Sequence, residues 1–173
     1  MNISVQMWRR IEGRFKRKKA RIELAKKMLE LGLRAGKDGI YIDDVKIPDL
    51  AMARALGIDR RVVKHTVKQI LEDPLLASIF TKLRPAGPDL SSIADALGYS
   101  VLEIRADPYR YGIVASVSDV LARHKIVIRQ ILSDDPDLTP DPKLTVVVEG
   151  KVPASVLREI GSSGVVKSVT LKL

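Results

Sequence analysis

The sequence has 173 residues and contains no cysteine, only two histidines and 4% aromatic residues. The absence of cysteine excludes disulfide bonds, thiolate metal sites and a cysteine nucleophile, and two histidines are too few for an all-histidine metal cluster. No apolar run approaches the ~18 residues that a membrane-spanning helix needs. Residues 1–20 carry charge where a signal peptide requires an apolar stretch. We therefore expect a cytoplasmic protein that does not associate with membranes.

The motifs of common enzyme classes are also missing. There is no phosphate-binding G-x-x-x-x-G-K-[ST] loop, no G-x-G-x-x-G sequence and no serine in a G-x-S-x-G turn. Paired acids such as Asp43-Asp44 and Asp134-Asp135 fall in predicted loops, where two solvated carboxylates are the ordinary outcome. We expect a protein that is not an enzyme and that needs neither a cofactor nor a metal.

The positive charge is concentrated in the first half of the chain. Lysine and arginine number 30 in all, against 21 acidic residues; residues 1–85 hold 20 basic and 10 acidic residues, and residues 86–173 hold 10 and 11. This asymmetry is typical of a nucleic-acid-binding module joined to a neutral one. The breaker cluster from Arg84 to Pro88 lies between the two halves. We predict a basic helical region over residues 1–85, a connecting helix over 86–98 and a second domain over 99–173.

The first segment has a helical pattern. Apolar residues recur at spacings of three and four from Val5 to about Leu33, which predicts a helix. Eight of the thirteen residues from Arg9 to Arg21 are basic, a density that suits contact with a phosphate backbone. The alternatives to phosphate contact are that this basic face is simply solvated, or that the apolar seam pairs two copies of the chain.

A more specific pattern follows. Pro48 to Leu56 predicts a short helix, Gly57-Ile58 a sharp turn, and Asp59 the cap of a second helix from Arg60 to about Glu72. Residues 49–68 resemble the helix-turn-helix DNA-binding motif, whose second helix enters the major groove. RNA binding and a plain basic helical hairpin remain alternatives. The residues expected to contact DNA are Arg60, Arg61, Lys64, His65 and Lys68.

Residues 75–97 are predicted to be helical, as Leu75–Leu83 and Asp89–Leu97. Residues 91–99 have the small residues and turn glycine of a second helix-turn-helix. However, residues 100–106 alternate like a strand and Pro108 would end a following helix. A connecting helix is therefore favoured over a repeated motif.

The second half predicts strands and helices in the order strand, helix, strand, strand, helix, strand. The strands are expected over residues 100–106, 126–132, 144–149 and 165–173, and the helices over 112–123 and 153–160. This order is that of the ferredoxin-like βαββαβ arrangement. The fold class predicted for the chain is α+β, with an all-helical helix-turn-helix region followed by this domain.

The junction of the first strand and helix, from Ala106 to Ile126, resembles the ACT domain, a small-ligand sensor that commonly binds amino acids. The family pattern places an acidic residue after the strand and a glycine before an aliphatic helix start; Tyr111 stands where its proline usually lies. The resemblance implies a homodimer with an amino acid as small-molecule effector, and dimerisation without an effector is the alternative. The positions that it assigns to the effector are Asp107, Tyr111, Gly112, Ile113 and Val114.

The combination of a helix-turn-helix region with an ACT-type domain resembles the predicted archaeal regulators of amino-acid metabolism. We therefore expect a transcriptional regulator that binds DNA, in which an effector at Asp107 and Gly112 changes the spacing of the two DNA-binding halves. The alternative is a non-enzymatic regulatory subunit that docks on a biosynthetic enzyme or binds RNA.

Overall fold

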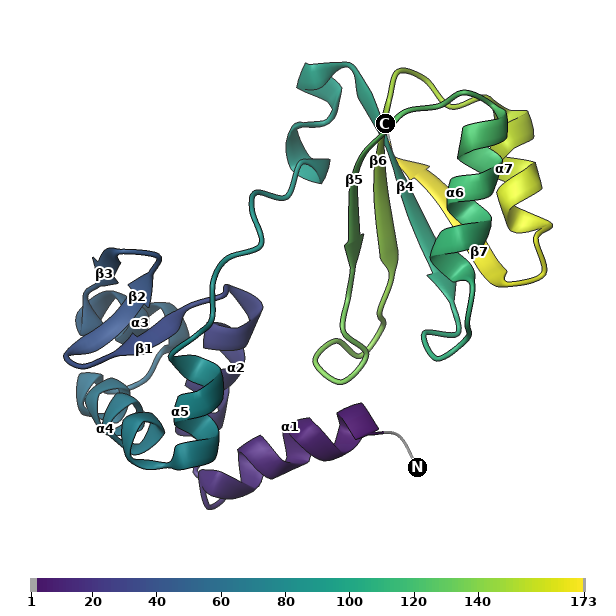
Figure 1. Cartoon of the computed structure of the whole chain (residues 1–173). Coiled ribbons are helices and arrows are strands. Elements are labelled where there is room, and N and C mark those ends of the chain that lie inside the picture. The colour runs from purple at the N-terminus through teal and green to yellow at the C-terminus, as the bar shows by residue number, and fades with distance from the viewer. Residues whose placement is uncertain (1–2, 173) are drawn as a thin grey trace. The chain divides into compact units, whose positions relative to one another are not determined.

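The computed structural model describes residues 3–172, which form two compact units, one ending at Gly87 and the other beginning at Pro88. The first unit combines helices with a small antiparallel sheet, and the second packs two helices on a four-stranded antiparallel sheet (Figure 1). The protein is therefore of mixed α and β structure. Among residues 3–172, every helix is too short or too polar to cross a lipid bilayer.

The prediction that the first unit is all-helical is wrong. A three-stranded antiparallel sheet of order β1-β2-β3 stands between α2 and α3 in the chain (Figure 1). The strands contain only three or four residues, too few for alternating hydrophobicity to be recognised in the sequence. The elements of this unit are α1 (Ile3–Arg14), α2 (Lys19–Glu30), β1 (Arg34–Gly36), β2 (Gly39–Ile42), β3 (Val45–Ile47), α3 (Asp49–Leu56), α4 (Arg60–Glu72) and α5 (Pro74–Phe80).

The single helix expected from Val5 to Leu33 is also wrong, because two helices occupy this range. The chain turns between α1 and α2 at residues 15–18, where Lys16 and Arg17 have φ angles of 48° and 58°. Phe15 at the start of the turn is fully buried. Its burial continues the apolar spacing across the break, and the sequence pattern therefore does not reveal the turn.

One hydrophobic core holds the first unit together. It includes side chains from α1, α2, α3, α4, α5 and the small sheet, so that none of these elements buries its apolar face alone. The largest fully buried side chains of this core are Phe15, Leu24, Met28, Leu33, Ile40, Ile70, Leu76 and Phe80.

The second unit has the order of elements predicted from the sequence. Its sheet has the order β5-β6-β4-β7 with every neighbouring pair antiparallel, and α6 and α7 cover one face (Figure 1). The core lies between these helices and the sheet and includes Leu102, Val146 and Leu121. The elements are β4 (Tyr99–Ala106), α6 (Ile113–Arg123), β5 (Ile128–Ser133), β6 (Leu144–Glu149), α7 (Ala154–Gly161) and β7 (Val166–Lys172).

The segment that precedes β4 is not a continuous helix as expected for residues 89–97. Two single 3-10 turns, η1 (Ser91–Ile93) and η2 (Asp95–Leu97), replace it. The side chain of Gln130 on β5 accepts a hydrogen bond from the Leu90 N–H at 2.9 Å and donates one to the Pro88 carbonyl at 2.7 Å. These bonds fasten the start of the segment to β5, and Ala94 packs on the sheet face opposite the helices.

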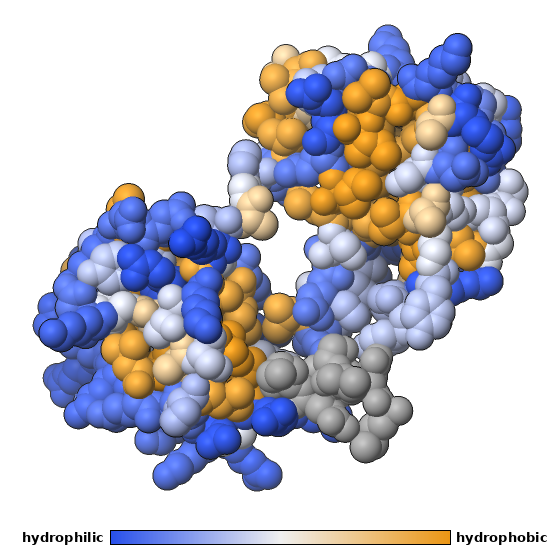
Figure 2. All heavy atoms as spheres, viewed as in Figure 1, coloured by the Kyte–Doolittle hydropathy of each residue, from blue (hydrophilic) through white to orange (hydrophobic). Residues whose placement is uncertain are grey.

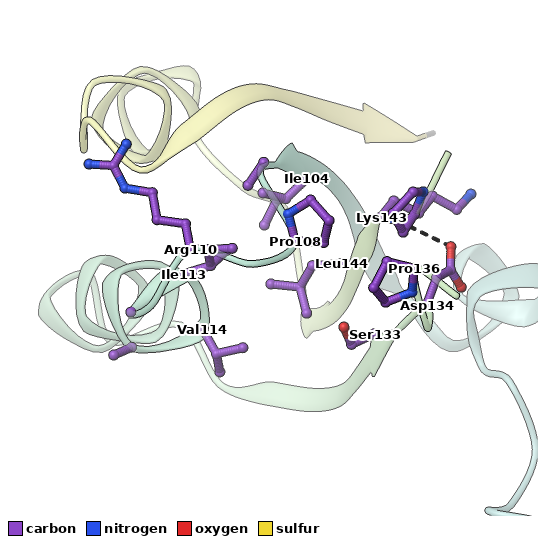
Figure 3. Close-up of a pocket in the computed structure, with 14 residues that line it drawn as sticks. Ile104, Pro108, Arg110, Ile113, Val114, Ser133, Asp134, Pro136, Lys143 and Leu144 are labelled. Atoms are coloured by element: carbon purple, nitrogen blue, oxygen red, sulfur yellow. Dashed lines mark hydrogen bonds between the residues drawn. The ribbon is translucent and has the colours of Figure 1, made fainter. Parts of the chain in front are cut away.

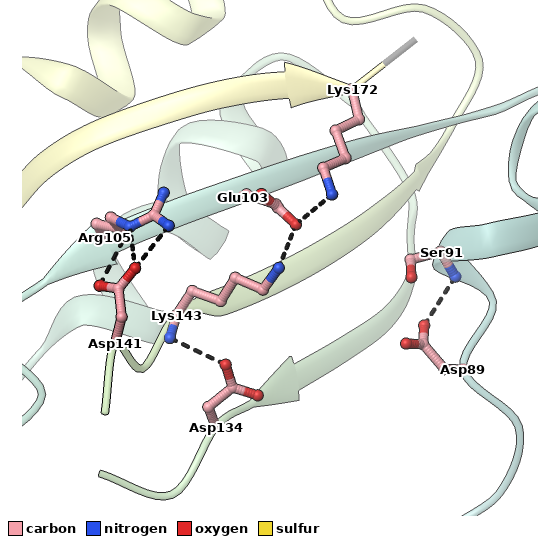
Figure 4. Close-up of polar contacts among 8 residues, drawn as sticks. All are labelled: Asp89, Ser91, Glu103, Arg105, Asp134, Asp141, Lys143 and Lys172. Atoms are coloured by element: carbon pink, nitrogen blue, oxygen red, sulfur yellow. Dashed lines mark hydrogen bonds and ion pairs between the residues drawn. The ribbon is translucent and has the colours of Figure 1, made fainter. Parts of the chain in front are cut away.

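This segment covers part of that face. Ala94 is 3% exposed and forms a separate small core with Val101 of β4 and Val147 of β6. The uncovered part of the face carries ion pairs. In Figure 4, Glu103 of β4 contacts Lys143 and Lys172, and its side chain is only 11% exposed.

Candidate nucleic-acid interface and candidate ligand pocket

Local sequence signals set the angle between α3 and α4. Gly57 adopts a left-handed conformation with φ of 64°, which favours glycine, and the Ile58 N–H donates to the Ala53 carbonyl at 2.9 Å. Asp59 then caps α4 by accepting a hydrogen bond from the Arg61 N–H at 2.7 Å. Ala53 is almost fully buried, and its small side chain allows the helices to approach closely. The two helices and turn predicted over residues 49–68 are therefore present.

The two sides of α4 differ sharply. Val63, Thr66, Val67 and Ile70 are buried on one side. The five residues predicted to contact DNA, which are Arg60, Arg61, Lys64, His65 and Lys68, are all exposed.

Few of these cations are neutralised within the protein. Arg61 lies 4.0 Å from Asp59, and Lys68 lies 3.7 Å from Glu72, both as exposed pairs that contribute little to stability. Among the residues that the structure describes, Arg60 and Lys64 have no acidic partner. The exposed side of α4 therefore presents unpaired positive charge to solvent.

A pocket of about 390 Å³ lies at the start of α6 in the second unit. Figure 3 shows Ile104, Pro108, Leu144 and Val114 around it, so that its walls are mainly apolar. Arg110 is the basic residue of its loop, but its guanidinium group points away from the centre of the pocket (Figure 3). The pocket therefore suits a small molecule with an apolar portion.

Three of the five positions assigned to an effector line this pocket, namely Gly112, Ile113 and Val114. Because α6 begins at Ile113, the backbone N–H groups of its first turn have no partner within the helix. Such groups bind anions such as carboxylates. Gly112 has φ of 85° and leads the chain into this helix start.

The other two positions, Asp107 and Tyr111, are not among the residues that line the pocket. The Asp107 carboxylate accepts a hydrogen bond from the Tyr109 N–H at 3.1 Å, within its own loop. The Tyr111 side chain is 95% exposed. Both belong to the loop beside the pocket.

The opposite wall of the pocket comes from the β5–β6 hairpin, whose tip the sequence predicts only to be a loop. Asp134 closes this hairpin: its backbone N–H donates to the Lys143 carbonyl at 3.0 Å, and its carboxylate accepts from the Lys143 N–H at 3.2 Å. No sequence signal links residues so distant from α6. The hairpin residues that line the pocket are Ser133, Asp134, Pro136, Pro142, Lys143 and Leu144.

No family profile matches the sequence, and no curated protein matches it. Among solved structures, the chain is similar to the C-terminal domain of the MgtC protein from Mycobacterium tuberculosis, with 17% identity over 43% of this chain and 83% of that one and a TM-score of 0.32.

Two further structures cover more of the chain. An AsnC family transcriptional regulator from Agrobacterium tumefaciens is 13% identical, with a TM-score of 0.30 over 90% of this chain and 88% of that one. PH0061 is 12% identical, with a TM-score of 0.29 and 89% of each chain covered. At TM-scores this low, these similarities carry no argument about function.

Proposed function

We propose that the protein is a transcriptional regulator that binds DNA through α4 and forms a homodimer through its second unit. The observation that carries this proposal is the exposed, unpaired basic side of α4. This helix follows α3 after a tight turn, as the second helix of a helix-turn-helix pair does. Arg60 and Lys64 extend from the first two turns of this helix.

A helix of this kind fits the major groove of DNA. The groove is about 12 Å wide and admits one α-helix, whose N-terminal residues contact base edges in helix-turn-helix proteins. Arginine can bind the O6 and N7 atoms of guanine with two hydrogen bonds, and lysine neutralises phosphates with release of counterions. Arg60, Arg61, Lys64, His65 and Lys68 are the proposed contacts.

The second unit, in this proposal, is an ACT-like domain that binds an amino acid or a related carboxylate. The free N–H groups at the start of α6 would hold the carboxylate, and the apolar walls around Val114 and Leu144 would take an apolar side chain. Gly112, Ile113 and Val114 line the proposed site, and Asp107 and Tyr111 stand in the loop at its edge.

Dimerisation is proposed to occur at a sheet edge. Among the described residues, β5 and β7 each pair with only one strand, and a strand edge presents unpaired backbone groups that can bind another chain. We favour the β5 edge because apolar side chains accompany it: Val127 is 51% exposed and Ile131 is 37% exposed. An effector that binds one arrangement of the dimer better would shift DNA affinity, typically by ~1–3 kcal/mol of coupling.

The test is fluorescence anisotropy or gel-shift binding of the full chain to genomic fragments, with a random duplex and an RNA of equal length as competitors. We expect sequence-selective DNA binding that is lost in Arg60→Ala and Lys64→Ala, at a cost of about 1–3 kcal/mol for each lost base contact. The control is Lys167→Ala, an exposed lysine of the second unit.

Two results would contradict the proposal. Variants of Arg60 and Lys64 that bind as the parent does would show that α4 is not the recognition helix. Preference for RNA, or the absence of nucleic-acid binding at low salt, would favour a regulatory subunit that acts on another macromolecule.

A further inference from the structure

Two turns from other parts of the first unit border the basic side of α4. The first is the β1–β2 turn, which contains Lys37. This turn and α4 together line a pocket of about 470 Å³, to which Lys37 and Asp38 contribute from the turn and Lys64 and Lys68 from the helix. The β1–β2 turn is therefore a direct neighbour of two proposed DNA contacts.

The second is the α1–α2 turn, residues 15–18. The side-chain amide of Gln69 on α4 donates a hydrogen bond to the Arg14 carbonyl at 2.7 Å and accepts one from Arg21 of α2. Arg14 also lies 3.4 Å from the Asp73 carboxylate, just beyond α4. The ends of α1 and α2 are thus fastened to the C-terminal half of α4, and Figure 1 shows their connection near the junction of α4 and α5.

The two turns meet different sides of the helix. At 3.6 residues per turn, Gln69 lies roughly 140° around the helix axis from Lys64. The residues at intermediate angles are Arg61, His65, Lys68 and Glu72, all of them exposed, with Glu72 paired to Lys68. Four of the five proposed DNA contacts on α4, all but Arg60, therefore lie on the arc from Lys64, beside the β1–β2 turn, to Gln69, beside the α1–α2 turn.

Both turns carry cations without partners. Lys16, Arg17, Lys18 and Lys37 are all exposed, and none is in an ion pair within residues 3–172. The acid of the β1–β2 turn, Asp38, is already engaged by Lys46 and by the Tyr41 hydroxyl, each at 2.5 Å. These contacts neutralise the turn's acidic side chain and leave Lys37 as its free charge.

We propose that these two turns and α4 form one three-part surface for a DNA duplex, with α4 in the major groove and the turns on the phosphates of the two bordering strands. This inference rests on the proposed function. A helix with its side chains is about 10–12 Å across and fills a groove about 12 Å wide, so that elements on its two sides face the sugar-phosphate backbones. The turns then supply affinity and orientation, whereas α4 supplies base recognition.

The turns are suited to this role because they are held in place. Phe15 is buried at the start of the α1–α2 turn, and the Lys18 N–H donates to its carbonyl at 3.0 Å. Gly36 and Gly39 are paired across the β1–β2 turn. Ordered backbones limit the conformational entropy that the lysine and arginine side chains lose when they bind.

The experiment measures the affinity of the full chain for a short random duplex at several salt concentrations. The variants are Lys37→Ala, Arg17→Ala and the charge-preserving Lys37→Arg, with Lys82→Ala as a control for an exposed lysine elsewhere in the same unit. Removal of one phosphate contact is expected to lower the slope of log K against log salt by ~0.9 and to weaken binding roughly fivefold near physiological salt. Lys37→Arg and Lys82→Ala should keep the parental slope.

The outcomes separate this inference from the proposed function. If Lys37→Ala and Arg17→Ala keep the parental affinity and slope while Arg60→Ala and Lys64→Ala lose binding, the three-part surface is wrong and the recognition helix stands. If the parent chain does not bind the duplex even at low salt, the proposed function itself fails. If Lys82→Ala lowers the slope as much as Lys37→Ala does, the effect is one of net charge, which overturns the inference.

Discussion

The ammonium group of Lys172 lies 2.7 Å from the carboxylate of Glu103 and thereby joins β7 to the central strand β4 across the sheet. Lys143, just before β6, contacts the same carboxylate oxygen (Figure 4). Hydrogen bonds from Lys143 and Lys172 hold the pKa of Glu103 below its ordinary value of 4.5, against the opposing effect of partial burial. Ionisation of Glu103 is therefore linked to folding of the second unit.

The first prediction concerns acid stability. Because the pKa of Glu103 is lowered in the folded state, its ionised form contributes stability that is present above the unfolded pKa near 4.5 and is lost as pH falls through the lower folded value. In urea denaturation between about pH 6 and pH 3, Glu103→Gln should be less stable than the parent at the upper end, and the difference should shrink on acidification. Curves of unfolding free energy against pH that stay parallel for the two proteins would contradict this prediction. The control is Asp95→Asn, which removes an exposed carboxylate.

The second prediction concerns the turn between α3 and α4. Gly57→Ala places a side chain at φ of 64° without any steric clash, since no atom lies within 4 Å of the added Cβ. We expect a loss of ~1–2 kcal/mol in unfolding free energy from the left-handed backbone alone. Gly13→Ala is the matched control: its site within α1 is equally open, and alanine should stabilise the helix by ~0.5–1 kcal/mol. Equal changes in unfolding free energy for Gly57→Ala and Gly13→Ala would exclude the left-handed backbone at Gly57 as the cause.

The third prediction concerns the ligand pocket. Val114 lines the pocket and is 45% exposed, so Val114→Trp should fill the cavity without disturbing the core. Titration calorimetry across the twenty amino acids should detect heat with the parent and none with this variant, while the thermal melting of both stays similar. If Val114→Trp still gives heat of binding, the ligand binds elsewhere. If the parent gives no heat with any amino acid, dimerisation is the one role left for the second unit.

The fourth prediction concerns the oligomeric state. A charge introduced by Ile131→Arg on β5 should convert a dimer to a monomer, because an unpaired charge buried in an interface costs several kcal/mol. Thr170→Arg on the exposed side of β7 is the control. Sedimentation or light scattering at several concentrations measures both. Dissociation by Thr170→Arg, with Ile131→Arg still dimeric, would assign the interface to β7 instead.

The sequence predicted best what is decided locally. The α3–α4 turn depends on Gly57 and Asp59, whose conformations and hydrogen bonds involve residues within four positions along the chain. The strands of the second unit are long enough for alternation to be recognised, as at Val101–Ile104. The start of α6 was likewise identified by Gly112.

What could not be predicted depends on distant contacts. The α1–α2 turn contains neither glycine nor proline. It is stabilised by the burial of Phe15 and by hydrogen bonds that join Arg14 and Arg21 to Gln69, 55 and 48 residues further along the chain. The 88–98 segment is held on the sheet by Gln130, some 40 residues later, which bonds to Leu90 and Pro88. The hairpin wall of the pocket depends on the pairing of β5 with β6, which no local motif specifies.

The position of Ala94 over the sheet decides where the second unit can be cut for separate expression. A fragment that starts at Tyr99 would remove the cover from Val101 and Val147, which are 3% and 0% exposed. These newly exposed valine side chains would promote self-association that is unrelated to any natural dimer. A fragment that starts at Pro88 retains the cover, and only such a fragment can report the true stoichiometry of this half of the chain.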